Sequence, residues 1–196
     1  MQNIENQTAE NVILVDADHV DRVAFNLIVN FERMLERRIP QADMARWIDC
    51  IALDGGLREG DHHTLVALIH SKEKSKLENF IPADYEQELN GKAFSDNLGE
   101  FSISALPVEN MTTKNDFFIE TLQTICTQED VKRIMIIGND EVYDKVSQVL
   151  RKIDDDKRIT VFSMEPRQGG NFRQEILGFS LMAALGIKGE EINKAN

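Results

Sequence analysis

Cysteines and long apolar segments are both scarce in this sequence. The two cysteines, Cys50 and Cys126, lie far apart and show neither a C-x-x-C nor a Cys/His zinc spacing. We therefore expect no disulfide scaffold but two reduced thiols, as is usual in the cytoplasm. Apolar runs such as residues 12–15 and 65–69 are far below the roughly 20 residues that span a bilayer. Residues 1–11 form a polar leader without the regions of a signal peptide, so we expect a cytoplasmic protein with no membrane segment.

Positive charge is the next shortage. The 196 residues contain 22 Lys and Arg against 34 Asp and Glu, which gives a formal net charge of -12. Because coating nucleic acid needs clustered cations, this balance excludes a broad basic face but leaves room for a locally basic groove. It also suits a site that gathers carboxylates around a cation. The length and the 42% hydrophobic content are typical of one folded domain.

Segments of strand and helix type alternate along most of the chain. Predicted strands cover residues 12–15, 64–70, 101–108, 134–137 and 159–162, and predicted helices cover residues 20–35, 113–125, 142–150 and 172–185. This alternation predicts a mostly parallel sheet with helices on both faces, which is a three-layer α/β/α sandwich. We expect a single domain over residues 12–188, with the polar leader before it and a polar tail, residues 189–196, after it.

The section between residues 41 and 99 is less regular. Residues 47–53 form either a strand that makes a hairpin with 64–70 or the end of a helix that begins near Gln41. Residues 71–90 look helical in pieces, with a break at Pro82, and residues 90–99 look like a loop. The pattern leaves the structure of this section open.

Carboxylates follow three of the predicted strands. Asp16 and Asp18 come directly after the first strand, Asp140 follows the fourth, and Asp116 lies in the first turn of the helix after the third, with Glu120 one turn further. Ligands of parallel sheets bind at the carboxyl ends of the strands, and acids gathered there repel one another unless a cation binds. Mg²⁺ and Mn²⁺ accept such oxygen ligands and can activate water toward a phosphodiester. The alternative for each acid is a helix cap, a common role for Asp.

Three short segments that contain these acids resemble the motifs of PIN-like nucleases, particularly the NYN branch. They are Val12 to Asp18, Lys114-Asn115-Asp116 and Ile134 to Asp140, and the resemblance spans residues 12–163 in order and spacing. It implies a Rossmann-like sandwich that cleaves RNA with Mg²⁺ or Mn²⁺ as cofactor.

The resemblance also assigns residues to the site. It implies Asp16, Asp116 and Asp140 as catalytic metal ligands, with Asp18 and Glu120 as secondary ligands. The chain departs from the family pattern in the turn after the fourth strand, where Asn139 belongs to a Gly-Asn pair in place of Ser-Gly and a valine replaces a second acid. The missing acid makes a non-catalytic binding module on the same fold the second interpretation.

The start of the first helix is also similar to the D-x-D-x-[TV] motif of haloacid dehalogenase-type phosphatases. That resemblance implies Asp16 as a covalent nucleophile and Asp18 as general acid/base, with Ser71 as the phosphate-binding residue and Lys114 as the family's lysine. Asp140 with Asp144 would then be the Mg²⁺-binding acids. Those phosphatases need a Gly-rich turn and a flap directly after the motif, whereas a continuous helical pattern begins here at Val20. The immediate helix favours the PIN-like interpretation.

Other polar groups have simpler interpretations. Asp61-His62-His63 is predicted to be a solvated turn, because adjacent side chains on a strand point to opposite faces and cannot easily serve one metal ion. His70 is predicted to be a hydrogen-bonded, partly buried histidine. Two local basic groups are the places to seek phosphate contacts, with solvated helix faces as the alternative: Lys72, Lys74 and Lys76, and Arg33, Arg37 and Arg38.

The end of the chain offers two further expectations. Residues 169–171 are predicted to form a turn in which Asn171 caps the final helix, since the segment lacks the Lys and Ser/Thr of a phosphate-binding loop. The final helix is apolar over a wide arc. We expect it to pack against the sheet, with a homodimer contact as the second interpretation.

Overall fold

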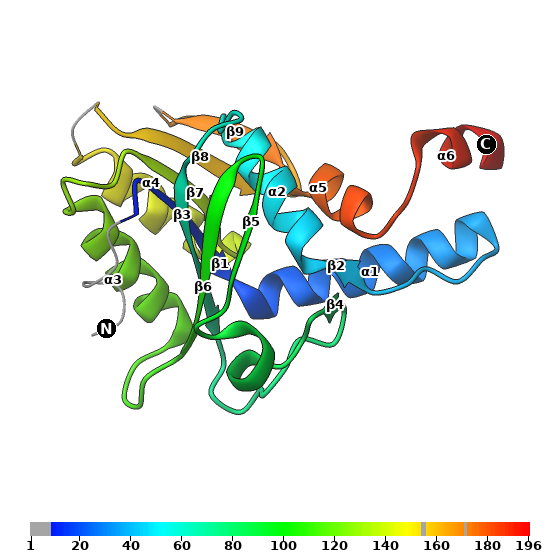
Figure 1. Ribbon diagram of the computed structural model, residues 1–196, viewed down its shortest axis with the longest axis horizontal. Helices are drawn as coiled ribbons and strands as arrows, with labels where there is room; N and C mark the ends of the chain where they lie inside the picture. Colours follow the sequence, from blue (N-terminus) through cyan, green and yellow to red (C-terminus); the bar gives the residue numbers. More distant parts are fainter. Residues whose placement is uncertain (1–8, 154–155, 171) are drawn as a thin grey trace.

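A seven-stranded sheet forms the centre of the protein (Figure 1). The computed structural model describes residues 9–196 except 154, 155 and 171. The strands are β1 (Asn11–Asp16), β3 (His63–His70), β5 (Ala93–Asp96), β6 (Gly99–Pro107), β7 (Arg133–Ile137), β8 (Arg158–Ser163) and β9 (Arg173–Ile176). Their order is β5-β6-β3-β1-β7-β8-β9, and only β5 runs antiparallel to its neighbour. The expected mostly parallel sheet is confirmed.

Helices cover both faces of this sheet. One face packs on α1 (Ala17–Leu35), α2 (Met44–Asp54) and α5 (Leu177–Ala184), and the other on α3 (Lys114–Cys126) and α4 (Tyr143–Leu150). The two cores separate along β1, because Ile13 and Val15 belong to the first and Val12 and Leu14 to the second. This is the predicted three-layer sandwich. None of the described helices has the length and apolar character needed to cross a membrane.

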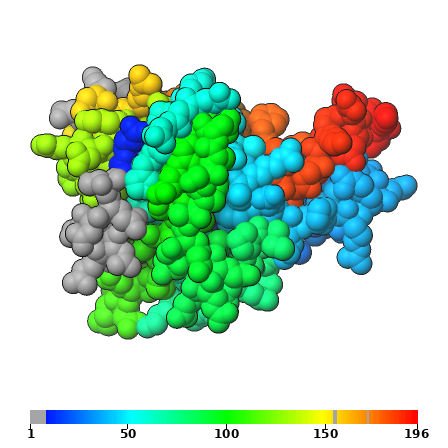
Figure 2. All heavy atoms as spheres, in the orientation of Figure 1, coloured from blue at the N-terminus to red at the C-terminus, as the bar shows by residue number. Residues whose placement is uncertain are grey.

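Helix α1 begins immediately after β1, as its sequence pattern predicts. Val20, Val23 and Ala24 are buried against the sheet, while the later turns project beyond it, side by side with the short helix α6 (Gly189–Ala195) (Figures 1 and 2). Arg37 holds α6 there, with its Nε 2.7 Å from Glu191 Oε1 and its Nη2 2.9 Å from Glu191 Oε2. The polar tail therefore forms a helix that docks on α1.

The irregular middle section differs from several expectations. Residues 47–53 belong to α2, so the hairpin interpretation is wrong and the helix interpretation is confirmed. Trp47 Nε1 donates a hydrogen bond to Ser180 Oγ of α5 at 3.2 Å and so connects the two helices. Residues 71–90 hold one π-helical turn, η1 (Tyr85–Leu89), and a short strand β4 (Phe80–Ile81) that pairs with β2 (Ala42–Asp43). Part of the predicted loop is β5. These short elements depend on long-range pairing that local periodicity does not encode.

The predicted final helix is also too long. Its first residues form the edge strand β9, and the helix starts only at Leu177. The segment 173–176 is mostly polar, and it becomes a strand because its backbone pairs with β8. Leu177 and Leu181 are buried, which confirms packing on the sheet side, and Phe179 is exposed. The predicted cap Asn171 lies outside the described residues. Both cysteines are free thiols, as expected.

The carboxyl group of Asp49 on α2 supports a prediction about pH. Burial, a hydrogen bond to Asp96 and the charges of Asp96 and Asp43 raise the pKa of Asp49 to about 7. Its folded-state pKa lies above the ordinary 3.8, so the folded chain binds the extra proton and stability falls as pH rises through this window. We expect Asp49→Asn to raise the free energy of unfolding by about 1 kcal/mol at pH 8, a value discounted for solvent screening. Below pH 4 we expect little difference. Urea unfolding at both pH values measures this, and an equal gain at both would contradict it.

Candidate functional site

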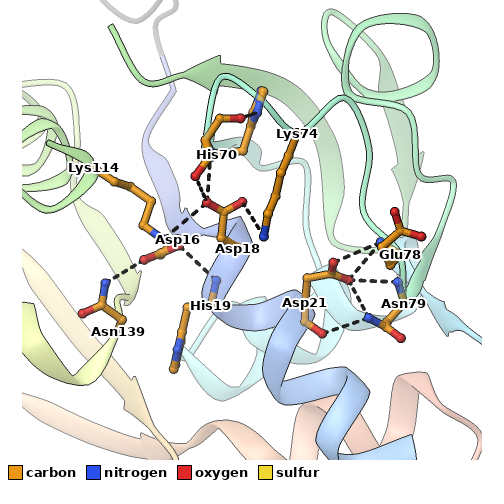
Figure 3. Close-up of polar contacts among 11 residues, drawn as sticks. Asp16, Asp18, His19, Asp21, His70, Lys74, Glu78, Asn79, Lys114 and Asn139 are labelled. Atoms are coloured by element: carbon orange, nitrogen blue, oxygen red, sulfur yellow. Dashed lines mark hydrogen bonds and ion pairs between the residues drawn. The ribbon is translucent and has the colours of Figure 1, made fainter. Parts of the chain in front are cut away.

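Two buried aspartates mark the carboxyl end of the central strand (Figure 3). Asp16 ends β1 and caps α1, where its Oδ1 accepts a hydrogen bond from the His19 backbone N–H at 3.1 Å. Asp18 lies in the first turn of α1, and the exposed fractions of Asp16 and Asp18 are 1% and 3%. Because the helix starts without an intervening loop, both carboxylates are held at the edge where parallel sheets bind ligands. Two unpaired charges at this depth would be costly.

Lys114 compensates both of these carboxylates. Its Nζ lies 3.2 Å from Asp16 Oδ1 and 3.4 Å from Asp18 Oδ2. Lys114 is the first residue of α3, whose start is fixed by the Thr113 hydroxyl, which accepts the Asp116 backbone N–H at 3.1 Å. Along β1, Asp16 follows Leu14 on the sheet face that α3 covers. The ammonium group therefore meets the two aspartates at the sheet edge.

Asp18 has an asymmetric environment. Its Oδ2 accepts hydrogen bonds from the backbone N–H and the hydroxyl of Ser71, while its Oδ1 is buried and has no hydrogen-bond partner among the described residues. Lys74 Nζ lies 3.9 Å from this Oδ1. Burial alone would raise the pKa of Asp18, but the Ser71 hydrogen bonds and the charges of Lys114 and Lys74 outweigh burial and lower it. Asp18 is therefore ionised at neutral pH.

Asn139 joins this centre from the end of β7. Its Nδ2 donates to Asp16 Oδ2 and to Asn115 Oδ1, both at 2.8 Å. Its own Oδ1 accepts the Glu141 backbone N–H at 2.9 Å and so caps the short 3₁₀ helix η2 (Asp140–Val142). The residue that departs from the family pattern thus links β1, α3 and the turn after β7.

An open groove of about 540 Å³ lies beside the two aspartates. Lys114 and Asn139, which contact Asp16, form part of its wall, and His19, Arg22 and Asp140 also line it. Burial lowers the pKa of His19, although the charges of Asp16 and Asp140 act in the opposite direction. The imidazole is neutral at pH 7. The groove thus combines two cations, amide groups, a neutral base and two carboxylates, since Glu141 lines it beside Asp140.

The other predicted acids do not join Asp16 and Asp18. Asp140 is 71% exposed at the rim, where Arg167 Nη2 lies 2.5 Å from its Oδ1. Asp116 and Glu120 line a different hollow, and Asp116 Oδ1 is 3.4 Å from Lys145 Nζ. Within the described part of the chain, no group of three or more His, Cys, Asp or Glu is arranged to hold a metal ion. The structure brings together two carboxylates and a lysine.

Nearly the whole chain matches one protein family. A family of unknown function, DUF6621, matches residues 5–192. The chain belongs to this family. No curated protein and no solved structure matches it.

Several polar residues outside the motifs also have defined roles. Asp21, one turn after Asp18, accepts backbone N–H groups of residues 78 and 79 at 2.9 to 3.2 Å and fixes the loop beside the site (Figure 3). The sequence signal for Asp21 is its spacing of three residues from Asp18, which places both side chains on one face of the helix. His70 is 5% exposed and its Nδ1 hydrogen-bonds the Ser71 carbonyl, as predicted. His62 and His63 have separate partners: His62 Nδ1 contacts Glu10 Oε1, and His63 Nε2 contacts Ser102 Oγ.

Proposed function

We propose that this chain hydrolyses phosphodiester bonds of RNA with the help of Mg²⁺ or Mn²⁺ at the Asp16–Asp18 pair. The observation that carries the proposal is this pair of almost fully buried carboxylates at the end of the central strand, beside an open groove. The immediate start of α1 agrees with the PIN-like pattern. An open groove also suits a polymer, which enters and leaves from the side, better than an enclosed cavity does.

The donor set fits a hard divalent cation. Asp16 and Asp18 offer carboxylate oxygens, and Asp18 Oδ1 lacks a hydrogen bond although it is buried. Lys114 now contacts both carboxylates, so a cation would share or take over its role. Asp140, on the rim of the same groove, is the next oxygen donor. When bound, such a cation supplies positive charge to the phosphate and lowers the pKa of a water.

The chain's own residues would bind and orient the substrate. Lys114 and Arg22 bring positive charge to the groove wall, where they can hold a phosphate group despite the overall negative charge of the protein. His19 is neutral at pH 7 and faces the same groove, so it can accept a proton from a water there. Asn139 fixes the orientation of Asp16 through its 2.8 Å hydrogen bond.

Phosphoryl transfer to Asp16 is the second candidate, and one observation favours it. Ser71, Asp18, Lys114 and Asp16 form one contact network, as the phosphatase resemblance implies. Two observations count against it. Helix α1 begins at Ala17 and leaves no room for a flap, and the lowered pKa of Asp18 keeps it ionised when a general acid must hold a proton. Mass spectrometry of the chain after incubation with p-nitrophenyl phosphate, or with beryllofluoride, would detect an adduct on Asp16 if this candidate is correct.

The direct test is cleavage of end-labelled single-stranded RNA by the purified protein. We expect cleavage with Mg²⁺ or Mn²⁺, none with EDTA, and weaker action on the matching DNA. RNA binding without cleavage in any divalent metal would indicate the non-catalytic binding module. If the protein neither binds nor cleaves the RNA, the proposal is wrong.

Asp140 and Asp116 are expected to differ in this assay. Asp140 lies on the groove that Lys114 lines, whereas Asp116 lies on the separate hollow and contacts Lys145. We therefore expect Asp140→Asn to lower kcat/KM for RNA by about tenfold or more, and Asp116→Asn to have a smaller effect. Initial rates at several RNA concentrations measure both. A larger loss for Asp116→Asn would show that α3 turns toward the groove when substrate binds.

A further inference from the structure

Three arginines begin three successive strands at the opposite edge of the sheet. Arg133 opens β7, Arg158 opens β8 and Arg173 opens β9. Arg133 is in register with Arg158, and Arg173 with Thr160, two residues further along β8. Paired residues of parallel strands present their side chains on one face, and alternate residues of one strand do the same. All three arginines therefore lie on the face that α2 covers.

Two of these guanidinium groups lie close to the backbone just after α2. A Cβ at Gly56 would lie 2.7 Å from Arg133 Nη1 and 3.8 Å from Arg173 Nη1, so the absence of a side chain lets the Arg133 guanidinium group pack directly against the backbone here. Gly56 also has φ +92°, a conformation that favours glycine. Arg58 lies two residues later, and its charge acts on Arg133. We call Arg58, Arg133, Arg158 and Arg173 the arginine cluster.

The hydrogen bonds within the described residues do not saturate this cluster. Arg133 Nη1 donates to the Gly55 carbonyl at 2.8 Å, but its buried Nε has no partner. Arg158 forms no hydrogen bond or salt bridge with any residue that the structure describes, apart from backbone pairing in the sheet. Burial lowers the pKa of Arg133, and the charges of Arg158, Arg58 and Arg173 add to that effect.

Nearby acids compensate only part of the positive charge. Glu175 Oε1 lies 2.7 Å from Arg173 Nη2, and the carboxylate of Asp54 also interacts with Arg173. Glu10, which raises the pKa of Arg133, is bound to His62 at 2.8 Å. Hydrogen bonds to carbonyl groups at and just after the end of α2, within residues 53–57, account for the position of Arg58 and of one Arg133 nitrogen. They do not explain Arg158 or the unpartnered Nε.

We propose that the arginine cluster binds the phosphate group of a small ligand, at a site separate from the Asp16–Asp18 edge. Guanidinium groups bind phosphate oxygens through paired N–H donors, and several of them on one face can surround a tetrahedral anion. Arg133 Nε and the exposed side chain of Arg158 supply the free donors, and Gly56 allows the Arg133 guanidinium group to lie close to the backbone after α2. This proposal does not depend on RNA cleavage, because the two sites lie at opposite ends of the strands.

Isothermal titration with inorganic phosphate, pyrophosphate and ADP tests the proposal on the intact chain. Titrations at matched ionic strength in NaCl separate specific binding from screening. We expect measurable binding of at least one probe and about tenfold or greater weakening in Arg158→Gln, since a hydrogen bond between charged groups is lost. Preference for pyrophosphate over ADP would point to a free phosphate compound, and the reverse preference to a nucleotide.

Two further variants locate the binding. Arg158 is exposed, so its replacement should not disturb folding, whereas Arg133→Gln also removes the contact with Gly55 and needs a check by circular dichroism. Arg151→Gln, on the exposed end of α4, is the matched control and should bind like the wild type. Absence of binding by the wild type would overturn the proposal. So would binding that persists in Arg158→Gln and in Arg133→Gln but disappears in Arg22→Gln, because the anion would then occupy the other groove.

Discussion

Replacing Asp16 with asparagine is expected to lower kcat for Mn²⁺-dependent RNA cleavage by about a hundredfold or more. The substitution keeps the size of the side chain and an oxygen that can accept the His19 N–H, so the cap of α1 is retained. It removes the negative charge that a cation needs and the ion pair with Lys114. Single-turnover cleavage of end-labelled RNA measures the effect, with circular dichroism to show that the fold is intact.

Asp43→Asn provides the matched control for this experiment. Asp43 also follows a strand and caps the next helix, where its Oδ1 accepts the Arg46 backbone N–H at 3.1 Å, but it is exposed. We expect this variant to cleave RNA like the wild type. Equal activity of Asp16→Asn and wild type would show that the Asp16–Asp18 pair is not the cleavage site. A similar loss of cleavage activity in both variants would indicate that the effect comes from the loss of helix capping.

Replacing Lys114 with methionine is expected to destabilise the metal-free protein by about 2 kcal/mol. Removing one partner of a fully buried ion pair costs about 3–5 kcal/mol, and the value is reduced here because a fifth of the Lys114 side chain is exposed. Among the residues that the structure describes, the ion pair that then remains to these two buried carboxylates is that of Lys74, at 3.9 Å from Asp18. Urea unfolding in EDTA, followed by circular dichroism, measures the loss.

Added metal should distinguish a cation site from a structural ion pair. If Asp16 and Asp18 bind Mg²⁺ or Mn²⁺, the ion replaces the lost ammonium, and a concentration of a hundred times its Kd stabilises by about 2.7 kcal/mol. The gain should be larger in Lys114→Met than in the wild type, where Lys114 competes. Lys145→Met, which removes an exposed contact with Asp116, is the control and should lose little stability. Destabilisation of Lys114→Met without recovery in either metal would contradict the proposed cation site.

The candidate site could be predicted only in part. Asp16 and Asp18 were identifiable because a β-branched apolar run, an acid and a helical pattern follow one another within a few residues. Asp116 and Asp140 were placed at the ends of the correct elements, but their side-chain directions depend on how α3 and η2 pack. Asp116 consequently lines another hollow, and Asp140 reaches Arg167. Lys114 belongs to one of the sequence motifs, but its contacts with both aspartates join residues nearly a hundred positions apart in the sequence. Local patterns do not encode such contacts.

The sequence by itself indicates two things. The scarcity and spacing of cysteine indicate free thiols, and the alternation of strand and helix patterns indicates an α/β sandwich. The repeat of apolar residues every 2 residues in strands and every 3.6 residues in helices is local, so it can be recognised without knowledge of the fold. Strand order and register are not local, because they are set by which apolar faces pack together across the chain. Only the tertiary structure therefore decided that residues 47–53 are helical, that 173–176 pair with β8, and that a lysine neutralises the two buried aspartates. The same long-range register assembles the arginine cluster from separate strands.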